Sequence, residues 1–455
     1  MMAEPESPSR SFTDLGINVE VAKALRSCGI TEPFPIQEAA IPDALAGRDV
    51  LGRGPTGSGK TLSFGLPMVQ RLSGRSSKAG TPRGLVLVPT RELAEQVSAD
   101  LALPAAALGQ RVVSVIGGVS INVQKKALLT PVDIVVATPG RAKDLIGQGA
   151  LNLSQVEITA LDEADHMADM GFLPQVVDLL ARTPANGQRL LFSATLDGDV
   201  AKLVDRFMND PVEHATAPSE AAVTTMEHYV FRVESREEKN LIAAEIALRP
   251  GKTIMFVRTR YGVDKQVKKL TRAGVRCAGL HGDKGQTTRA KALAGFADGS
   301  IPVLVATDLV ARGIDVAAVS LVVHVDPPAE HKAYVHRAGR TARAGESGTV
   351  VTLVLPPQVD DVEKMFARAG VSPTELPVTP GCPELVQITG ARPELVKQVA
   401  APQQAATKPA GKSGKKPAGK AAQKSSGGSS GSRSARGRVQ PSRPHRKKRP
   451  RPKKS

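Results

Sequence analysis

A glycine-rich run near the start of the chain has the residue types that hold nucleotide phosphates. It fits the pattern G-x-x-x-x-G-K-[ST], follows the short apolar segment Asp49–Leu51, and consists of Gly54, Pro55, Thr56, Gly57, Ser58, Gly59, Lys60 and Thr61. The backbone N–H groups of such a loop close around phosphate oxygens, the lysine reaches the β and γ phosphates, and the last hydroxyl can ligate Mg²⁺. A glycine-rich turn without a ligand is the alternative, but chance yields the full pattern in only roughly a few per cent of chains this long. The run therefore predicts a P-loop.

An acidic run ends a later apolar segment and has the chemistry to act on a bound nucleotide. Asp162 is suited to hold Mg²⁺ through its water shell, and Glu163 to orient and deprotonate the water that attacks the γ-phosphate. An acidic cluster alone is most often a solvated loop. Because this one ends a buried type of strand downstream of a P-loop, we interpret it as the catalytic partner of that loop.

Short apolar runs indicate the strands that must position these residues. Between residues 84 and 195 they read GLVLVPT, DIVVATP, EITALDEAD and RLLFSAT; between 253 and 355 they read TIMFVRT, VRCAGLHG, IPVLVATD, LVVHVD and GTVVTLVL, with helical segments such as Gln286–Ala297 between them. Nearly continuous hydrophobicity is typical of parallel strands that are covered on both faces. The sequence therefore predicts two α/β units in tandem, each a parallel sheet between helices, with a ligand cleft between the units.

The positive charge of the chain is concentrated at its C-terminal end. The chain has 455 residues, 61 Lys+Arg and a net charge of +17, and 17 of those basic residues lie in residues 401–455, which contain no Asp or Glu. Residues 1–400 are therefore formally neutral. The tail has Val439 as its one branched aliphatic residue and no aromatic residue. With so little apolar surface to offset the entropy of ordering, we expect residues 401–455 to form a disordered tail, whose positive charge is suited to a nucleic-acid partner.

The cysteine pattern and the absence of long apolar runs exclude several classes of protein. Cys28, Cys277 and Cys382 are widely spaced and form no C-x-x-C pair, so a disulfide framework or a thiolate zinc site is not expected. No run of about 18 apolar residues occurs, and the N-terminus lacks the pattern of a secretory signal. We expect a cytoplasmic protein without a membrane anchor.

The residues Asp162, Glu163, Ala164 and Asp165 spell D-E-A-D, and about a dozen further motifs follow the order of one known family. From about Phe12 to Phe366 the sequence closely resembles the DEAD-box RNA helicases. The resemblance implies two RecA-like domains, which we place at residues 1–212 and 226–370 with a linker at 213–225. Residues 371–400 form an extension for which the sequence allows either a short helix or an extended segment.

The resemblance also implies that the nucleotide is ATP. The stretch Gly29–Gln37 looks like the family's Q motif, in which Gln37 reads the adenine edge and the upstream aromatic Phe12 stacks on its face. An amide offers both the donor and the acceptor that adenine requires. Two positions depart from the commoner pattern: Ile30 stands where an aromatic is frequent, and Phe34 where Thr is frequent.

By the same match, residues at strand ends and helix starts are expected to hold RNA. Free N–H groups and small residues at such places allow close approach to phosphates. These residues are Pro89, Thr90, Arg91, Gly117, Gly118, Thr138, Pro139, Gly140, Arg141, Gln286, Arg289, Thr307, Arg312 and Gly313. If the resemblance is set aside, the alternative is that Thr90 is an ordinary helix cap and that Arg289 or Arg312 is a surface cation.

Residues 336–343 resemble the family's motif VI. The match makes Arg340 and Arg343 arginine fingers that stabilise charge on the transferred phosphoryl group, a role worth about 10³–10⁵ in rate; a solvated basic helix start is the alternative. Ala338 and Ala342 differ from the commoner residues but remove no charge. Asp315 is expected to contact the ATP ribose. Coupling of hydrolysis to strand separation is assigned by the resemblance to Asp165, Ser193, Ala194, Thr195 and His336.

These assignments predict an ATP-dependent RNA helicase with ATP and Mg²⁺ as its cofactors. Since the P-loop and Glu163 lie in the first unit and the arginine fingers in the second, hydrolysis is expected to require closure, which ATP and RNA both favour. The protein is expected to act as a monomer on single strands and short duplexes, with little sequence preference.

Two alternatives remain open at this point. The first is an ATP-gated RNA clamp or annealing chaperone, in which unwinding is incidental. The second is a DNA helicase of related architecture, which the Q motif and the DEAD tetrapeptide disfavour. The biological RNA is left open, with ribosomal and RNA-decay ribonucleoproteins as candidate partners.

Overall fold

The structure, a computed structural model, describes residues 10–54, 57–196, 198–215, 226–308, 319–341 and 348–400, with side chains described up to residue 396. Several of the predicted site residues lie outside these ranges, as does the predicted tail at residues 401–455. Those site residues are Pro55, Thr56, Arg312, Gly313, Asp315 and Arg343.

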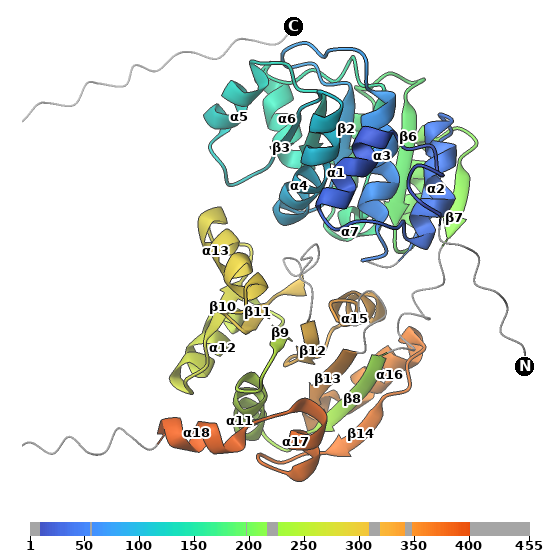
Figure 1. The fold of residues 1–455 in the computed structure, drawn as a ribbon. Coiled ribbons are helices and arrows are strands. Elements are labelled where there is room, and N and C mark those ends of the chain that lie inside the picture. The colour runs from blue at the N-terminus through green and yellow to red at the C-terminus, as the bar shows by residue number, and fades with distance from the viewer. Residues whose placement is uncertain are drawn as a thin grey trace, which may run out of the picture. The chain divides into compact units, whose positions relative to one another are not determined.

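The first sheet has seven parallel strands in the order β3-β4-β2-β5-β6-β1-β7 (Figure 1). In chain order they are β1 Val50–Arg53, β2 Gly84–Leu87, β3 Val112–Val115, β4 Ile134–Ala137, β5 Ile158–Leu161, β6 Gln188–Ser193 and β7 Val212–Ala215.

Helices cover both faces of this sheet, and alternate strand residues point into two separate cores. One core joins strand residues such as Val86 and Phe192 to α1 Val19–Ser27, α2 Pro35–Leu45, α3 Lys60–Arg71 and α4 Arg91–Ala107. The other joins Leu85 and Leu191 to α5 Ile121–Leu128, α6 Pro139–Gly147, α7 Ala164–Asp169, α8 Leu173–Leu180 and α9 Gly198–Phe207. Burial on both faces explains why β2, β4 and β5 consist of apolar and small residues with little alternation.

The second sheet repeats this plan with seven parallel strands in the order β10-β11-β9-β12-β13-β8-β14. They are β8 Met226–Arg232, β9 Lys252–Phe256, β10 Cys277–Leu280, β11 Val303–Ala306, β12 Val319–His324, β13 Gly348–Val354 and β14 Thr374–Pro377. One core includes residues of α13 Gln286–Ala297, α15 His331–Ala338 and α16 Val359–Ala369. The other face is covered by α11 Arg236–Ala247, α12 Arg260–Arg272, α17 Pro383–Thr389 and α18 Pro393–Ala400; the short 3₁₀ turn η1 spans Pro356–Gln358.

The two predicted parallel sheets are confirmed, but the sequence did not indicate four of their strands. β7 and β14 are edge strands of four residues whose side chains are at most half-buried, so they lack the continuous apolar run that marks a central strand. β7 continues the first sheet to Ala215, and β14 brings part of the open segment at 371–400 into the second sheet by pairing with β8. β3 and β8 are interrupted by Ser114 and His228, respectively.

Parallel pairing sets the carboxyl ends of the strands at one edge of each sheet, where ligands of open α/β sheets bind. The P-loop follows β1, the acidic run follows β5, and Ser193 ends β6. None of the helices within the described ranges has the length and apolar character that a bilayer crossing needs.

Candidate active site and nucleic-acid interface

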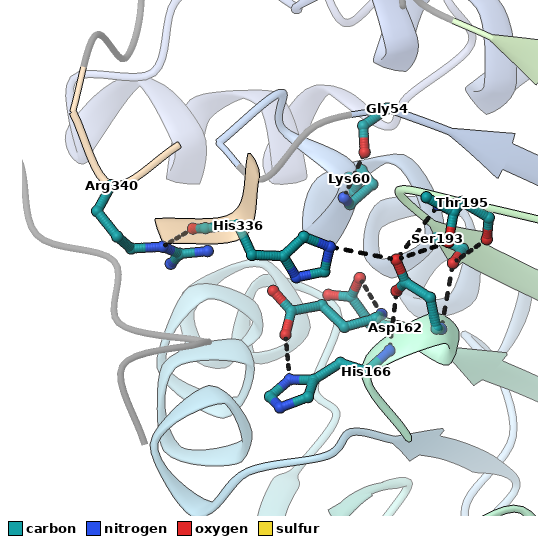
Figure 2. A network of polar contacts seen from close by, with 10 residues as sticks. Gly54, Lys60, Asp162, His166, Ser193, Thr195, His336 and Arg340 are labelled. Carbon is teal, nitrogen blue, oxygen red and sulfur yellow. Dashed lines mark hydrogen bonds and ion pairs between the residues drawn. The ribbon is translucent and has the colours of Figure 1, made fainter. Parts of the chain in front are cut away.

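The P-loop residues that the structure describes link β1 to α3. Gly54 N–H donates to the carbonyl of Ser193 at 3.2 Å, and Gly59 caps α3 with a φ of +87°, a conformation that favours glycine. Lys60, the first residue of α3, is 6% exposed and donates from Nζ to the carbonyl of Gly54 at 2.7 Å (Figure 2). The hydroxyl of Ser58 is buried without a hydrogen-bond partner among the described residues. The loop thus holds a cation and an unused hydroxyl at the start of a helix, a place that favours anions.

Gln37 fastens the start of α2 to this loop. Its Oε1 accepts from the backbone N–H of Phe34 at 2.9 Å, and its Nε2 donates to the carbonyl of Gly59 at 2.9 Å. Phe34 is 45% exposed and lies against Gly59, whereas Phe12 is 3% exposed and packs in the core between the first sheet and α1–α4. The exposed ring beside the P-loop is therefore that of Phe34, at one of the two positions where the sequence departs from the family pattern.

The acidic run begins directly after β5 and is almost completely buried. Asp162 and Glu163 are 3% and 8% exposed, and Glu163 N–H donates to Oδ1 of Asp162 at 2.9 Å. Burial raises the pKa of Asp162 to about 7, against the opposing charge of Lys60. Burial alone would also raise the pKa of Glu163, but a hydrogen bond to His166 and the charges of His166, Arg340 and Lys60 outweigh it and hold that pKa well below its usual range. The charge of Lys60 thus does not fully offset the burial of Asp162, whereas Glu163 stays ionised.

Asp165 lies at the centre of a network that joins the first turn of α7 to the end of β6. Its backbone N–H donates to Oγ of Ser193 at 3.2 Å, and its Oδ2 accepts from the N–H and the hydroxyl of Thr195 at 3.2 and 3.3 Å. Ser193 closes the network by donating to the carbonyl of Thr195 at 2.7 Å. Figure 2 shows these groups around one carboxylate. Ala194 lies between the two hydroxyl residues.

Two residues of motif VI reach this cluster from the second sheet. Nε2 of His336, on α15, lies 3.8 Å from Oδ2 of Asp165 (Figure 2). Arg340 is 2% exposed, donates from Nε to the carbonyl of His336 at 3.2 Å, and contributes to the low pKa of Glu163. The structure therefore brings Lys60, Asp162, Glu163, Asp165, His336 and Arg340 together.

Most of the predicted RNA residues of the first sheet surround one hollow of about 390 Å³. Its lining includes Pro89, Thr90, Arg91, Gly117, Thr138, Gly140, Arg141 and, from α13, Arg289. Thr90 caps α4 by accepting from Leu93 N–H at 3.2 Å. Gly118 has a φ of +81°, a backbone conformation that favours glycine, and its backbone lies close to the Arg91 guanidinium. Pro139 is buried at the start of α6 and does not line the hollow.

The second sheet contributes a neighbouring hollow of about 500 Å³. It is lined by Arg258, Thr259, Arg260, Tyr261, Gly282, Thr307 and Asp308, and Gly282 lines both hollows. Thr307 thus does not line the hollow that the RNA residues of the first sheet surround, but lines the neighbouring one. Asp308 forms an ion pair with Arg337 of motif VI.

Polar contacts, one of them buried, join α4 of the first sheet to α13 of the second. Nη2 of Arg289 donates to Oε2 of Glu92 at 2.5 Å, and Nε2 of Gln286 donates to Oε2 of Glu95 at 3.2 Å. Both side chains of the Glu92–Arg289 pair are nearly inaccessible, at 5% and 6% exposure. The sequence analysis assigned a role to Arg289 but none to Glu92 or His166. His166 stands three residues after Glu163 and could have been recognised from that spacing.

Comparison with known proteins gives matches over most of the described chain. Residues 34–203 match the model of the DEAD/DEAH box helicase family, and residues 238–345 match the helicase conserved C-terminal domain. A DEAD-box ATP-dependent RNA helicase CshA of Geobacillus kaustophilus is 38% identical over 77% of this chain and 74% of its own length. This chain belongs to the DEAD-box family of ATP-dependent RNA helicases.

Other relatives of this helicase include longer proteins. A mitochondrial DEAD-box helicase of Arabidopsis thaliana is 37% identical over 84% of the chain and 64% of its own length, and a chloroplastic one of Zea mays matches over half of its length. Among solved structures, S. cerevisiae Dbp5 bound to RNA and ADP BeF3 superimposes with a TM-score of 0.74 at 26% identity, covering 86% of this chain and all of the other. Mss116p bound to single-stranded RNA and AMP-PNP gives 0.73 at 25% identity, covering 88% and 86%.

Proposed function

We propose that this helicase hydrolyses ATP in an RNA-stimulated cycle that separates short duplexes or remodels ribonucleoproteins. The observation that carries the proposal is the meeting of Glu163 and Asp165, beside the P-loop, with Arg340 and His336 of the second sheet. A site completed by residues of two domains turns over only while both domains are engaged. Relatives that are named ATP-dependent RNA helicases, and similar structures bound to RNA with ADP BeF3 or AMP-PNP, support it.

In the proposed reaction, Glu163 takes a proton from water as the water oxygen bonds to the γ-phosphorus. The bond from that phosphorus to the bridging oxygen breaks, and its electron pair leaves with ADP. Lys60 and Arg340 balance the negative charge that spreads over the phosphoryl oxygens. Arg343 and Asp315 are proposed, from the sequence alone, to add a second finger and a ribose contact. Gln37 orients the P-loop and adenine, with Phe12 or Phe34 against the base.

The donor set beside Lys60 fits Mg²⁺. Asp162 supplies a buried carboxylate that lacks a full counter-charge, and Thr61 supplies a hydroxyl on the first turn of α3. These are hard oxygen donors of the kind that Mg²⁺ binds, commonly with several of its waters retained. We propose that they hold the ion, which would supply charge stabilisation to the phosphates.

RNA is proposed to bind along the two neighbouring hollows through its sugar-phosphate backbone. Arg91, Arg141 and Arg289 supply cations, and glycines allow close approach. The tail, residues 401–455, is proposed as a basic tether that raises affinity without sequence preference. Ribosomal and RNA-decay ribonucleoproteins are the proposed partners. The free thiols of Cys28, Cys277 and Cys382 support a reducing compartment such as the cytoplasm.

The test is ATP hydrolysis by the full chain with single-stranded RNA, with single-stranded DNA and with neither. We expect that RNA stimulates ATP hydrolysis and that DNA does not. Glu163→Gln keeps the size of the side chain but removes the base, so we expect this variant to lose hydrolysis. Absence of stimulation by RNA, or normal turnover by Glu163→Gln, would refute the proposal. Strand separation of a short duplex by the same proteins then distinguishes a helicase from an RNA clamp.

A further inference from the structure

The side chain of His166 donates a hydrogen bond to the carboxylate of Glu163. Its Nδ1 lies 3.1 Å from Oε2 of Glu163, and the His166 ring is 1% exposed (Figure 2). A carboxylate only accepts, so the proton of this contact is on Nδ1. Nε2 is buried and finds no hydrogen-bond partner among the described residues. The ring is thus fixed to Glu163 through one nitrogen.

The backbone around the pair shows why this contact determines where the Glu163 carboxylate points. Glu163 is the N-cap of α7 and has φ and ψ of 52° and 52°, a left-handed conformation that is strained for a residue with a side chain. His166 is on the first turn of α7, three residues later, on the same side of the helix. Its own backbone N–H donates to Oδ1 of Asp165 at 3.0 Å, so the ring starts from a fixed position.

We propose that His166 is a positioning residue for Glu163, the general base of the proposed hydrolysis, and this inference rests on that proposed function. By holding Oε2, the ring leaves Oε1 to accept the proton of the attacking water. A base is effective only within hydrogen-bond reach of its proton, and small errors of position reduce rates strongly. His166 itself neither touches ATP nor exchanges a proton in this role.

Two amide variants separate positioning from packing. In His166→Asn the amide nitrogen is attached at the same point as Nδ1, so it can donate to Oε2. In His166→Gln the amide is one bond farther out, nearer the place of Nε2, and His166→Leu has no donor. If His166 only fills space, Gln and Leu should serve at least as well as the smaller Asn.

The experiment measures kcat, KM for ATP and the RNA concentration for half-maximal stimulation in the full chain. We expect kcat to fall about tenfold or more in His166→Gln and His166→Leu, and to stay within about threefold in His166→Asn, with KM and the RNA concentration unchanged in all three. His214→Asn, in which the ring contacts Asp43 far from α7 in the sequence, is the control and should match the wild type. Thermal unfolding of each variant identifies any that do not fold; if His166→Leu is one of them, the Asn and Gln pair decides.

The proposal fails if Gln and Asn behave alike, or if the variants change KM rather than kcat. Failure of the proposed function looks different. In that case the wild type is not stimulated by RNA, or Glu163→Gln is fully active. A wild type that behaves as proposed, an inactive Glu163→Gln and a fully active His166→Gln would overturn only the role given to His166.

Discussion

The guanidinium of Arg289 donates to the carboxylate of Glu92 at 2.5 Å, and these two residues belong to helices that cover different sheets. Neither side chain is more than 6% exposed. Oε1 of Glu92 and Nε of Arg289 have no hydrogen-bond partner among the described residues, so the pair is not fully satisfied. A buried pair of this kind contributes little net stability but penalises the loss of either partner. It therefore makes α4 and α13 energetically dependent on each other.

Glu92→Gln and Arg289→Gln should each lower the RNA-stimulated ATPase rate about tenfold, because either leaves one charge buried without its partner. The double variant should lose less than the sum of the two losses, with a coupling free energy of about 0.5–3 kcal/mol. Lys202→Gln, which removes an exposed pair with Asp199, is the control and should have no effect. Additive losses in the double-mutant cycle would show that the contact does not couple the domains.

Gln37→Glu should raise KM for ATP about tenfold while kcat changes less than about threefold. Glutamate keeps an acceptor for the N–H of Phe34 but loses the donor to the carbonyl of Gly59, so that the P-loop loses its link to α2. Gln70→Glu is the matched control, since the Gln70 amide also bridges a backbone N–H and a carbonyl, those of Asn18 and Gly16. Equal effects of the two variants on KM would mean that the change acts through general stability.

Replacement of Ser193 and Thr195 by alanine should separate hydrolysis from unwinding. The double variant removes an acceptor for the Asp165 N–H and a donor to its Oδ2, the oxygen that faces His336. We expect ATP turnover to fall less than about threefold and duplex separation to fall more than about tenfold, since the general base is retained. Ser73→Ala, which removes a serine hydroxyl that donates to the carbonyl of Gln70 at the end of α3, is the control and should change neither rate. Parallel losses of both activities would contradict this coupling role.

His324 should make the second sheet less stable in acid. The side chain is fully buried, its Nδ1 contacts Oγ1 of Thr352 at 3.0 Å, and burial together with the charges of Arg337 and His228 holds its pKa well below 6.5. Tyr334, which also contacts this ring, is uncharged, because burial raises its pKa. Below pH 6.5 the unfolded chain therefore binds a proton that the folded chain does not, and the free energy of unfolding falls by up to about 1.4 kcal/mol per pH unit.

Urea unfolding between pH 8 and pH 5 measures this effect in the wild type and in His324→Leu. The variant should lose the part of the pH dependence that comes from His324, whatever its stability at pH 8. If the free energy of unfolding depends on pH below 6.5 equally in His324→Leu and in the wild type, the His324 ring takes up its proton as readily in the folded protein as in the unfolded chain.

Much of the fold and of the nucleotide site could be predicted because the signals are local. Central parallel strands need continuous apolar runs, so β2, β4, β5 and β6 could be recognised, and a phosphate loop needs its glycines and Lys60 in a fixed order. Parallel pairing then brings those loops to one edge without further information.

The parts that could not be predicted depend on partners far apart in the chain. Glu92 and Arg289 are 197 residues apart, and nothing near either position specifies the other. The edge strand β7 is defined by its pairing with β1, since its own side chains are half-exposed. The burial of Phe12 likewise depends on the distant segments that form its core, whereas Phe34 is 45% exposed. By contrast, the contact of His166 with Glu163 spans three residues, a spacing that the sequence itself displays.

Deletion of residues 401–455 tests the tail by itself, because it removes 17 basic residues from a chain whose first 400 residues are formally neutral. We expect weaker RNA binding at low salt and a shallower dependence of affinity on salt, since each phosphate contact to a single strand adds about 0.7 to the slope of log K against log salt. ATP turnover at saturating RNA should be unchanged, because the proposed catalytic residues are all retained. A tail of equal length with its Lys and Arg replaced by Gln is the control and should behave like the deletion. If the neutral tail restored the wild-type affinity, the tail would contribute through its length and not through its charge. If the deletion left the salt dependence of RNA affinity unaltered, the tail would not act as an electrostatic tether.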